Sequence, residues 1–345
     1  MNAYITSDHV NIQTGGGLVT GQEYEALQQV GAVALFDGTR MQRPSSVWDH
    51  DDYLSRVVET GDYDVVHFYA GTFSKTVQTV RLRGVRAVTY TAAAHCVEES
   101  RREHESFGIP YDYPHLTEPV LWQRYLQGYL SADVLVVPSL HSRDVMRRYG
   151  RTGRIETLPH GVHLPQSTQL LPEAFTVGYL GAVGPDKGLI YLLKAWKQLN
   201  YGDSLLVIGG RDSQSQFVNS LIEHTGCRNV VQTGWVDNVS DFYNRCSLYV
   251  QPSVSEGFGC EVLEAMAHAR PVLCSEGAGA SDCVPSGWTF PIRDGKEWAE
   301  KIECAKSIIR KGVSPGFLDQ WRNRAGQYTW DKIRERYIQL WKEYL

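Results

Sequence analysis

The feature that most constrains the fold is a regular alternation of short apolar segments with longer amphipathic ones along the whole chain. This alternation predicts parallel sheets whose strands are joined by helical crossovers. In the first half, strands are expected at residues 3–6, 32–36, 64–69, 85–91, 134–138 and 154–158. In the second half, they are expected at residues 176–180, 204–208, 229–233, 248–251 and 271–274. The clearest helical stretches are residues 23–30, 53–59, 120–130, 189–199, 214–224 and 259–268.

The two series of segments meet at residues 164–172, LPQSTQLLP, whose prolines and polar side chains are typical of a linker. A chain of 345 residues is long enough for two domains that each bury a core. We therefore predict two α/β domains, residues 1–168 and residues 169–328. Because the second already has its full set of segments, the amphipathic helix predicted at 329–345 is expected to pack on the first. The apolar stripe of that helix consists of Trp330, Ile333, Tyr337, Leu340 and Trp341.

Composition excludes several classes of protein. The chain is 42% hydrophobic and 21% charged, which is typical of a globular protein and not of a disordered one. No segment approaches the ~20 apolar residues of a membrane-spanning helix, and the start of the chain lacks the pattern of a secretory signal. Seven cysteines without a C-x-x-C pair predict reduced thiols in a cytoplasmic protein. The net charge of −5 argues against nucleic acid as a partner.

The strongest local signal is the segment 252–267, PSVSEGFGCEVLEAMA. Its pattern predicts the end of a strand, a turn that contains glycines, and a helix. Backbone N–H groups at a helix start suit a phosphate, and glycines let the phosphate approach closely. Glu256 precedes this helix and Glu264 lies about two turns into it. Carboxylates accept hydrogen bonds from hydroxyl groups, so the two acids indicate sugar or ribose beside an anion site.

A second motif occupies residues 177–188, VGYLGAVGPDKG. It combines a strand, a glycine-rich turn and Lys187 just before the next helix. A lysine in this place can neutralise a diphosphate. The spacing is not that of the P-loop, G-x-x-x-x-G-K-[ST], so a P-loop is not supported.

Each of these residues also has an ordinary structural explanation when taken alone. Glu256 could be an acid favoured by the helix dipole, Glu264 could lie on a solvated helix face, and Lys187 could be a solvated lysine in a turn. The two motifs taken together favour the functional interpretation.

The strand–G-x5-K-G–helix segment, followed by PSxxEGFGxxxLEAMA and RPVLCSEGAGASDCV, resembles the retaining glycosyltransferases of family four. The resemblance implies the GT-B fold, in which two Rossmann-like, doubly wound parallel-sheet domains face a cleft and the C-terminal helix crosses back to the first domain. The first domain, residues 1–168 with 329–345, would be the acceptor side, and residues 169–328 would bind the nucleotide-sugar donor. Looser matches in the first half include a glycine-rich loop at Gly15, Gly16 and Gly17, and the segment LPHGV at 158–162.

The resemblance also implies roles for individual residues. Glu256, the first acid of the family's E-x7-E pair, would hold the donor sugar's hydroxyls, and Glu264 would bind the ribose. Lys187 would bind the diphosphate, and His95 matches a histidine near the donor sugar, although a histidine satisfied by neighbouring backbone is an equal alternative. The other donor-binding residues would be Gly16, Gly17, Val236 beside the base, and the backbone of Gly257, Phe258 and Gly259.

Two departures from the family pattern affect this expected site. Where many members have an arginine after the second glycine of the lysine motif, this chain has Ala182. Arg211 is a speculative substitute for that phosphate-binding charge, although a surface turn residue is the simpler interpretation. Where members often have GGxxE, this chain has GAGASD at 277–282.

Other candidate motifs are given ordinary explanations. Asp62 and Asp64 imitate a D-x-D metal motif, but they precede a strand, where acids commonly mark a turn. We therefore expect no catalytic metal and no cofactor. The arginines between residues 143 and 154 are interpreted as a solvated face rather than a patch for phosphate or a membrane surface, and at most a weak membrane contact is expected.

The function implied is transfer of a sugar from a UDP- or GDP-sugar to an acceptor hydroxyl on a saccharide, lipid or other molecule, with retained configuration and without a metal. The alternatives are a GT-B sugar-nucleotide epimerase, a phosphorylase, and a nucleotide-sugar binding protein without catalytic activity. A glucosyltransferase that modifies DNA is less favoured because the first half has no basic excess. The sequence does not identify the nucleotide, the sugar or the acceptor.

Overall fold

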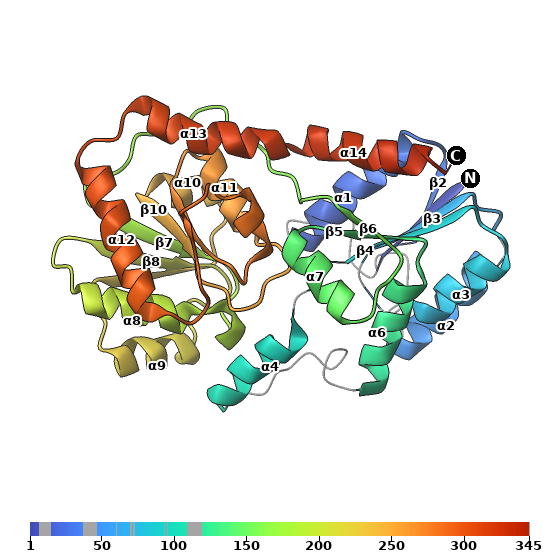
Figure 1. Ribbon diagram of the computed structural model, residues 1–345, viewed down its shortest axis with the longest axis horizontal. Helices are drawn as coiled ribbons and strands as arrows, with labels where there is room; N and C mark the ends of the chain where they lie inside the picture. Colours follow the sequence, from blue (N-terminus) through green and yellow to red (C-terminus); the bar gives the residue numbers. More distant parts are fainter. Residues whose placement is uncertain are drawn as a thin grey trace. The chain divides into compact units, whose positions relative to one another are not determined.

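The computed structural model describes residues 1–6, 15–36, 47–59, 61–69, 71, 73–92, 94, 96–108 and 119–344. The chain forms two compact units. Unit 1 comprises Met1–His95, Asp112–Gly161 and Trp330–Leu345, and unit 2 comprises Cys96–Tyr111 and Val162–Thr329. Each unit contains a six-stranded parallel sheet covered by helices (Figure 1), which confirms the predicted α/β class.

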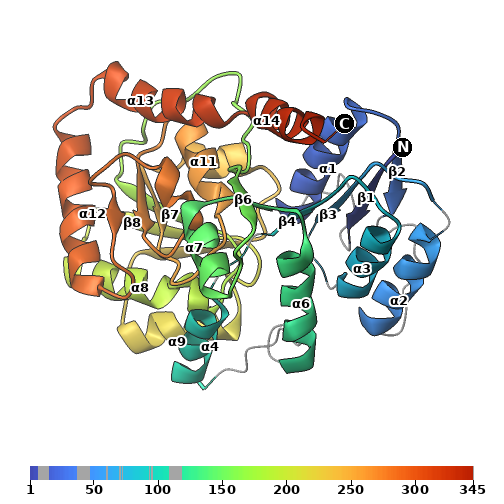
Figure 2. The same cartoon turned by 45° about the vertical axis from the view of Figure 1, so that its right-hand side comes forward.

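The sheet of unit 1 has the order β2-β1-β3-β4-β5-β6. Its strands are β1 (Asn2–Thr6), β2 (Val33–Phe36), β3 (Val65–Tyr69), β4 (Ala87–Thr91), β5 (Val134–Val137) and β6 (Arg154–Thr157). Its helices are α1 (Gly15–Gln28), α2 (Val47–Val58), α3 (Ser74–Leu82), α6 (Pro119–Ser131), α7 (Leu140–Arg148) and α14 (Trp330–Lys342). The helices α1 and α14 cover one face, and α2, α3 and α6 cover the other (Figure 2).

The sheet of unit 2 has the order β12-β11-β10-β7-β8-β9. Its strands are β7 (Thr176–Leu180), β8 (Leu205–Gly209), β9 (Val230–Gly234), β10 (Leu248–Gln251), β11 (Val272–Ser275) and β12 (Thr289–Phe290). Its helices are α4 (Val97–Ser106), α8 (Leu189–Leu199), α9 (Gln216–Thr225), α10 (Val239–Asn244), α11 (Cys260–Ala267), α12 (Gly295–Arg310) and α13 (Pro315–Ala325). The core under α8, α9 and α12 lies on one face, and the core under α10, α11 and α13 lies on the other.

Most predicted elements are present within one or two residues of their expected bounds, and α8 has the predicted limits. The glycine-rich loop is an exception, because Gly15–Gly17 form the first turn of α1. Glycine is tolerated there since the first N–H groups of a helix have no intrahelical partner. The helices α3, α4, α10, α12 and α13 and the short strand β12 were not predicted. Within the described residues, no helix is both long enough and apolar enough to cross a bilayer.

The two compact units differ in two details from the predicted boundary at residue 168, which stays a prediction. The segment 162–172 is grouped with unit 2. The buried Arg270 donates to the Gln169 carbonyl at 2.6 Å, and Arg322 donates to the Pro165 carbonyl at 2.7 Å. The segment Cys96–Tyr111 also belongs to unit 2, although the chain on both sides of it belongs to unit 1.

The terminal helix packs on unit 1, with its predicted apolar stripe fully within the core. A buried polar network fixes it there. The Glu23 carboxylate on α1 accepts hydrogen bonds from Tyr337 on α14 at 2.6 Å and from Tyr4 on β1 at 2.8 Å. The same carboxylate lies 3.1 Å from Nε2 of His67 on β3, and both side chains have no exposed surface. The helix is therefore held by specific polar contacts as well as by apolar burial.

Candidate functional site

The site is built where two strand–turn–helix segments of unit 2 meet. The turn between β7 and α8 contains a short 3-10 helix, Pro185–Lys187, and ends at Gly188 with a φ of 70°. A Cβ on Gly188 would lie 2.0 Å from the carbonyl oxygen of Pro252, so only glycine permits this close packing. Lys187 forms an ion pair with Glu256, and the two side chains are 22% and 24% exposed. The two sequence motifs are therefore brought together, as the proposed donor site requires.

Backbone hydrogen bonds hold the segment that carries Glu256. Its N–H donates to the Gly277 carbonyl at 2.9 Å, and its carbonyl accepts from Gly279 at 3.1 Å. The carbonyl of Phe258 accepts from Ala280 at 2.7 Å. The loop GAGASD, where the chain departs from the family pattern, thus supports this segment through its main chain.

The helix α11 starts without a side-chain cap, at Gly259 with a φ of 91°. In the same unit α9 and α12 begin at the capping side chains Ser215 and Asp294, whereas α4 and α8, like α11, begin without one. An N-terminus that no side chain caps suits an anion, because the helix dipole and the N–H groups both favour negative charge.

The Glu264 carboxylate is oriented by a neighbour that sequence reasoning missed. The hydroxyl of Tyr243 on α10 donates to it at 2.8 Å. His268, one turn after Glu264, packs its ring against Tyr243 with centroids 5.1 Å apart. Burial raises the pKa of Glu264, and the hydrogen bond from Tyr243 opposes that rise. No local sequence signal could have indicated Tyr243, because it lies 21 residues before its partner.

The charged groups around Lys187 at the site are acidic side chains. Burial works against the charge of Lys187, but the charges of Glu256 and Asp186 outweigh burial and raise the pKa of Lys187 well above its usual value. A third acid, Glu261, has its carboxylate 3.5 Å from the position of a Cβ on Gly181. It lies within the segment 252–267, but no role was predicted for it. Burial, and then the charges of Glu264 and Glu256, raise the pKa of Glu261 from 4.5 to about 7.

This shift predicts a pH dependence of stability. A carboxyl group whose pKa is raised in the folded state binds protons more tightly there, so its contribution is fully present below pH 4.5 and is lost as the pH rises toward 7. The Glu261→Gln variant should lack this loss. Thermal melts of the wild type and the variant from pH 4.5 to 8 test this prediction. If the melting temperature changes equally with pH in both proteins, the assignment to Glu261 is contradicted.

The remaining predicted residues fall in three places. Val236 lies after β9, and its Cγ2 atom would be 3.0 Å from a Cβ on Gly209 at the end of β8. Arg211 is exposed in the turn that follows β8. Gly210 beside it packs against the backbone of Gly181. Gly16 and Gly17 belong to unit 1, and His95 lies outside the described residues. Their proposed roles stay predictions.

Other polar clusters have different explanations. Of the arginine-dense run, Arg151 is buried and donates to the carbonyls of Leu130 and Ala132 at 2.8 Å. Arg147 donates to the Arg151 carbonyl, and Arg154 pairs with Glu156 and Glu343. In the part of the chain that the structure describes, no group of three His, Cys, Asp or Glu side chains is arranged to hold a metal.

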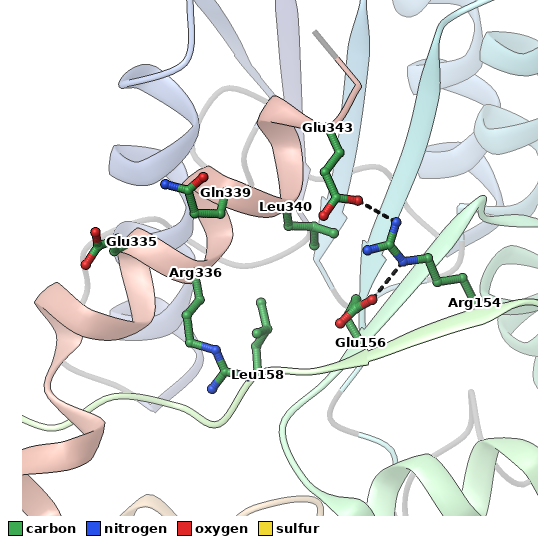
Figure 3. Close-up of a pocket in the computed structure, with 8 residues that line it drawn as sticks. All are labelled: Arg154, Glu156, Leu158, Glu335, Arg336, Gln339, Leu340 and Glu343. Atoms are coloured by element: carbon green, nitrogen blue, oxygen red, sulfur yellow. Dashed lines mark hydrogen bonds and ion pairs between the residues drawn. The ribbon is translucent and has the colours of Figure 1, made fainter.

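A pocket of about 350 Å³ lies in unit 1 between β6 and α14 (Figure 3). Among its lining residues, Arg154 is bonded to both Glu156 and Glu343. No residue of the predicted site lines it. The pocket lies in unit 1, away from the Lys187 and Glu256 motifs of unit 2, so it does not belong to the candidate site.

Comparisons with known proteins identify the family and the fold. A family model described as Glycosyltransferase Family 4 matches residues 16–166, and one described as Glycosyl transferases group 1 matches residues 174–305. The capsular polysaccharide biosynthesis glycosyltransferase CapM of Staphylococcus aureus is 31% identical over 185 residues, 51% of this chain and 49% of that protein. The D-inositol 3-phosphate glycosyltransferase of Streptomyces bingchenggensis is 25% identical over 64% of this chain and 54% of its own length. The alignments thus span about half the length of these curated relatives.

Solved structures share the fold over the whole chain. Sucrose-phosphate synthase from Thermosynechococcus elongatus superposes with a TM-score of 0.77 and 17% identity, over 99% of this chain and 98% of that one. Anabaena HepE in complex with UDP and glucose superposes with a TM-score of 0.72 and 16% sequence identity, over 99% of this chain and 100% of that one. The two parallel-sheet units therefore form a GT-B fold. With the two family models together matching most of its length, the chain belongs to the glycosyltransferases of family-four type.

Proposed function

We propose that this protein transfers a sugar from a nucleotide diphosphate sugar to an acceptor hydroxyl, with the anomeric configuration retained and without a metal ion. The observation that carries the proposal is the Lys187–Glu256 pair beside the start of α11, with Glu264 held by Tyr243 on the same helix. These residues follow the carboxyl ends of β7 and β10, where ligands bind in open α/β sheets. HepE was solved with UDP, which supports a nucleotide of this kind as the ligand.

The Lys187–Glu256 ion pair suggests how the donor is received. A diphosphate carries more negative charge than one carboxylate, so it replaces Glu256 as the partner of Lys187. The Glu256 carboxylate is then free to accept hydrogen bonds from the sugar's hydroxyls. The ribose is bound by Glu264, whose carboxylate Tyr243 already orients.

The chemistry then depends on position and charge. As the bond between the sugar and the diphosphate breaks, negative charge grows on the leaving group. The Lys187 ammonium and the N-terminus of α11 stabilise that charge. The acceptor hydroxyl attacks from the face that the diphosphate leaves, and a donor phosphate oxygen takes its proton. No nucleophile of the enzyme is needed, and the protein supplies orientation.

The Glu256→Gln variant should separate binding from transfer. It keeps the shape of the side chain but weakens its hydrogen bonds to hydroxyls, so transfer should fall by about 10- to 100-fold, the scale of losing one or two charged hydrogen bonds. Calorimetry with the free nucleoside diphosphate should show unchanged or tighter binding, since Lys187 loses its competing partner. A loss of nucleotide affinity equal to the loss of transfer would contradict the role of Glu256.

A panel of nucleotide sugars tests the function itself. Thermal stabilisation by one donor, followed by its slow hydrolysis, is the expected result. An epimerised nucleotide sugar in place of a released sugar would favour the epimerase. Stabilisation without any turnover, with acceptors present, would favour a binding protein.

A further inference from the structure

The helix α4 has a buried face that is polar. Its buried residues are Val97, Ser100, Glu103 and His104, spaced to share one side of the helix. A helix that only covers a core buries an apolar stripe. Polar side chains are rarely buried unless specific partners satisfy them, so this face is built for particular contacts.

Two of those contacts reach the residue before Lys187. The hydroxyl of Ser100 donates to the Asp186 carboxylate at 3.3 Å, and Nε2 of His104 lies 3.4 Å from the other carboxylate oxygen. The Asp186 carbonyl in turn accepts from the N–H of Val254 at 2.8 Å. Asp186 is thus fixed by its side chain to α4 and by its backbone to the second motif.

A second set of contacts reaches the residue before Glu256. The N–H of Cys96, at the start of α4, donates to the hydroxyl of Ser255 at 2.8 Å. That hydroxyl donates back to the Cys96 carbonyl at 3.1 Å, and Ser255 is 1% exposed. The segment 252–257, PSVSEG, is therefore hydrogen-bonded to the start of α4 through its second serine, Ser255.

Charged contacts also anchor α4. Arg293 pairs with Glu99 at 2.6 Å and also with Glu103, and Tyr191 on α8 donates to Glu103 at 3.0 Å. Arg293 adopts a φ of 67°, a left-handed conformation that is uncommon for residues with side chains. Phe107 adds an edge contact with Phe217 on α9, with centroids 6.1 Å apart.

We infer that α4 is the positioning element of the diphosphate site, with Ser100 and His104 setting Lys187 through Asp186 and the Cys96 backbone setting Glu256 through Ser255. This inference rests on the proposed function. None of these residues touches the donor; each holds a neighbour of a residue that does. The effect of Ser100 and His104 should therefore appear in recognition of the second phosphate, because that is the group Lys187 contacts, and the effect of Ser255 should appear in sugar transfer.

The test compares nucleotides that differ by one phosphate. Calorimetry with UDP and UMP, or GDP and GMP if the guanine nucleotide binds, gives the affinity gained from the second phosphate. The double variant Ser100→Ala/His104→Ala should lose about tenfold in diphosphate affinity, the scale of losing a charged hydrogen bond, and little in monophosphate affinity. Ser255→Ala, which acts through Glu256, should instead lower sugar transfer and leave diphosphate affinity unchanged or tighter, as expected of Glu256→Gln. Glu105→Gln, exposed on the same helix, is the matched control and should behave as the wild type.

The outcomes separate the two claims. If Lys187→Ala lowers the diphosphate-to-monophosphate ratio but the Ser100→Ala/His104→Ala variant does not, or if that variant weakens both nucleotides equally, the inference is overturned and the proposed function stands. If Lys187→Ala leaves the ratio unchanged, the proposed function fails. Amide exchange in the free protein is the second readout: the Val254 and Lys187 amides should exchange faster in the α4 variants than in Glu105→Gln, and unchanged exchange overturns the inference even if no nucleotide binds.

Discussion

Replacing Lys187 with alanine should remove most sugar transfer while leaving the fold intact. The ammonium is the one cation that the two motifs place at the site, and the loss of one preorganised group that stabilises developing negative charge costs about 10²–10³ in turnover. The substitution also leaves Glu256 without its partner, so repulsion of the diphosphate adds to the loss. Initial rates with the identified donor, with circular dichroism to check folding, measure the effect.

Lys194→Ala is the matched control for this prediction. Lys194 lies on the same segment, on the exposed side of α8, with its ammonium 5.8 Å from the centre of the Tyr191 ring. It should retain wild-type turnover. Near-normal activity in Lys187→Ala would refute the role of the lysine, and an equal loss in both variants would show that the effect is not specific to the site.

Replacing Glu23 with alanine should produce the largest loss of stability. The substitution leaves His67, Tyr4 and Tyr337 without their buried acceptor, and each buried donor left unsatisfied costs about 1 to 3 kcal/mol. Amide exchange in β3 and β4 measures the effect within unit 1. Burial works against ionisation of Glu23, but hydrogen bonds from His67, Tyr337 and Tyr4 lower its pKa, so the network's contribution should be lost as the pH falls below about 4.5.

Glu25→Ala supplies the comparison, because Glu25 lies two residues further along the same helix and pairs with Arg334 while 42% exposed. An exposed pair of this kind contributes about 0 to 1 kcal/mol. Similar losses in the two variants would mean that α1 as a whole, and not the buried network, fixes α14 to the sheet.

The sequence allowed a prediction where the pattern that sets a feature lies within a few neighbouring residues. Except for the short β12, the strands of both sheets and the helix at 189–199 are set by apolar periodicity within a few residues, and their prediction was confirmed. Lys187 and Glu256 were also found from local motifs, although their ion pair joins residues 69 apart in the chain. The terminal helix could be assigned to unit 1 because its stripe, from Trp330 to Trp341, needed a surface to cover.

Contacts between segments far apart in the chain could not be predicted from the sequence. The helix α4, VEESRREHES, carries almost no apolar periodicity, and its buried face becomes meaningful only beside Asp186 and Arg293. Tyr243 has its role only because α10 lies against α11. The contacts of the predicted linker were also beyond local signals, since Arg270 and Arg322, about 100 or more residues later, donate to its Gln169 and Pro165 carbonyls.

The central claim is that the donor's diphosphate is bound between Lys187 and the start of α11. A crystal structure of the protein with UDP, or with GDP if the guanine nucleotide binds, tests it most directly. We predict the second phosphate within hydrogen-bond distance of the Lys187 ammonium and of the first N–H groups of α11, the ribose on Glu264, and the Glu256 carboxylate released from Lys187. A nucleotide bound away from these residues, for example in the pocket between β6 and α14, would contradict it.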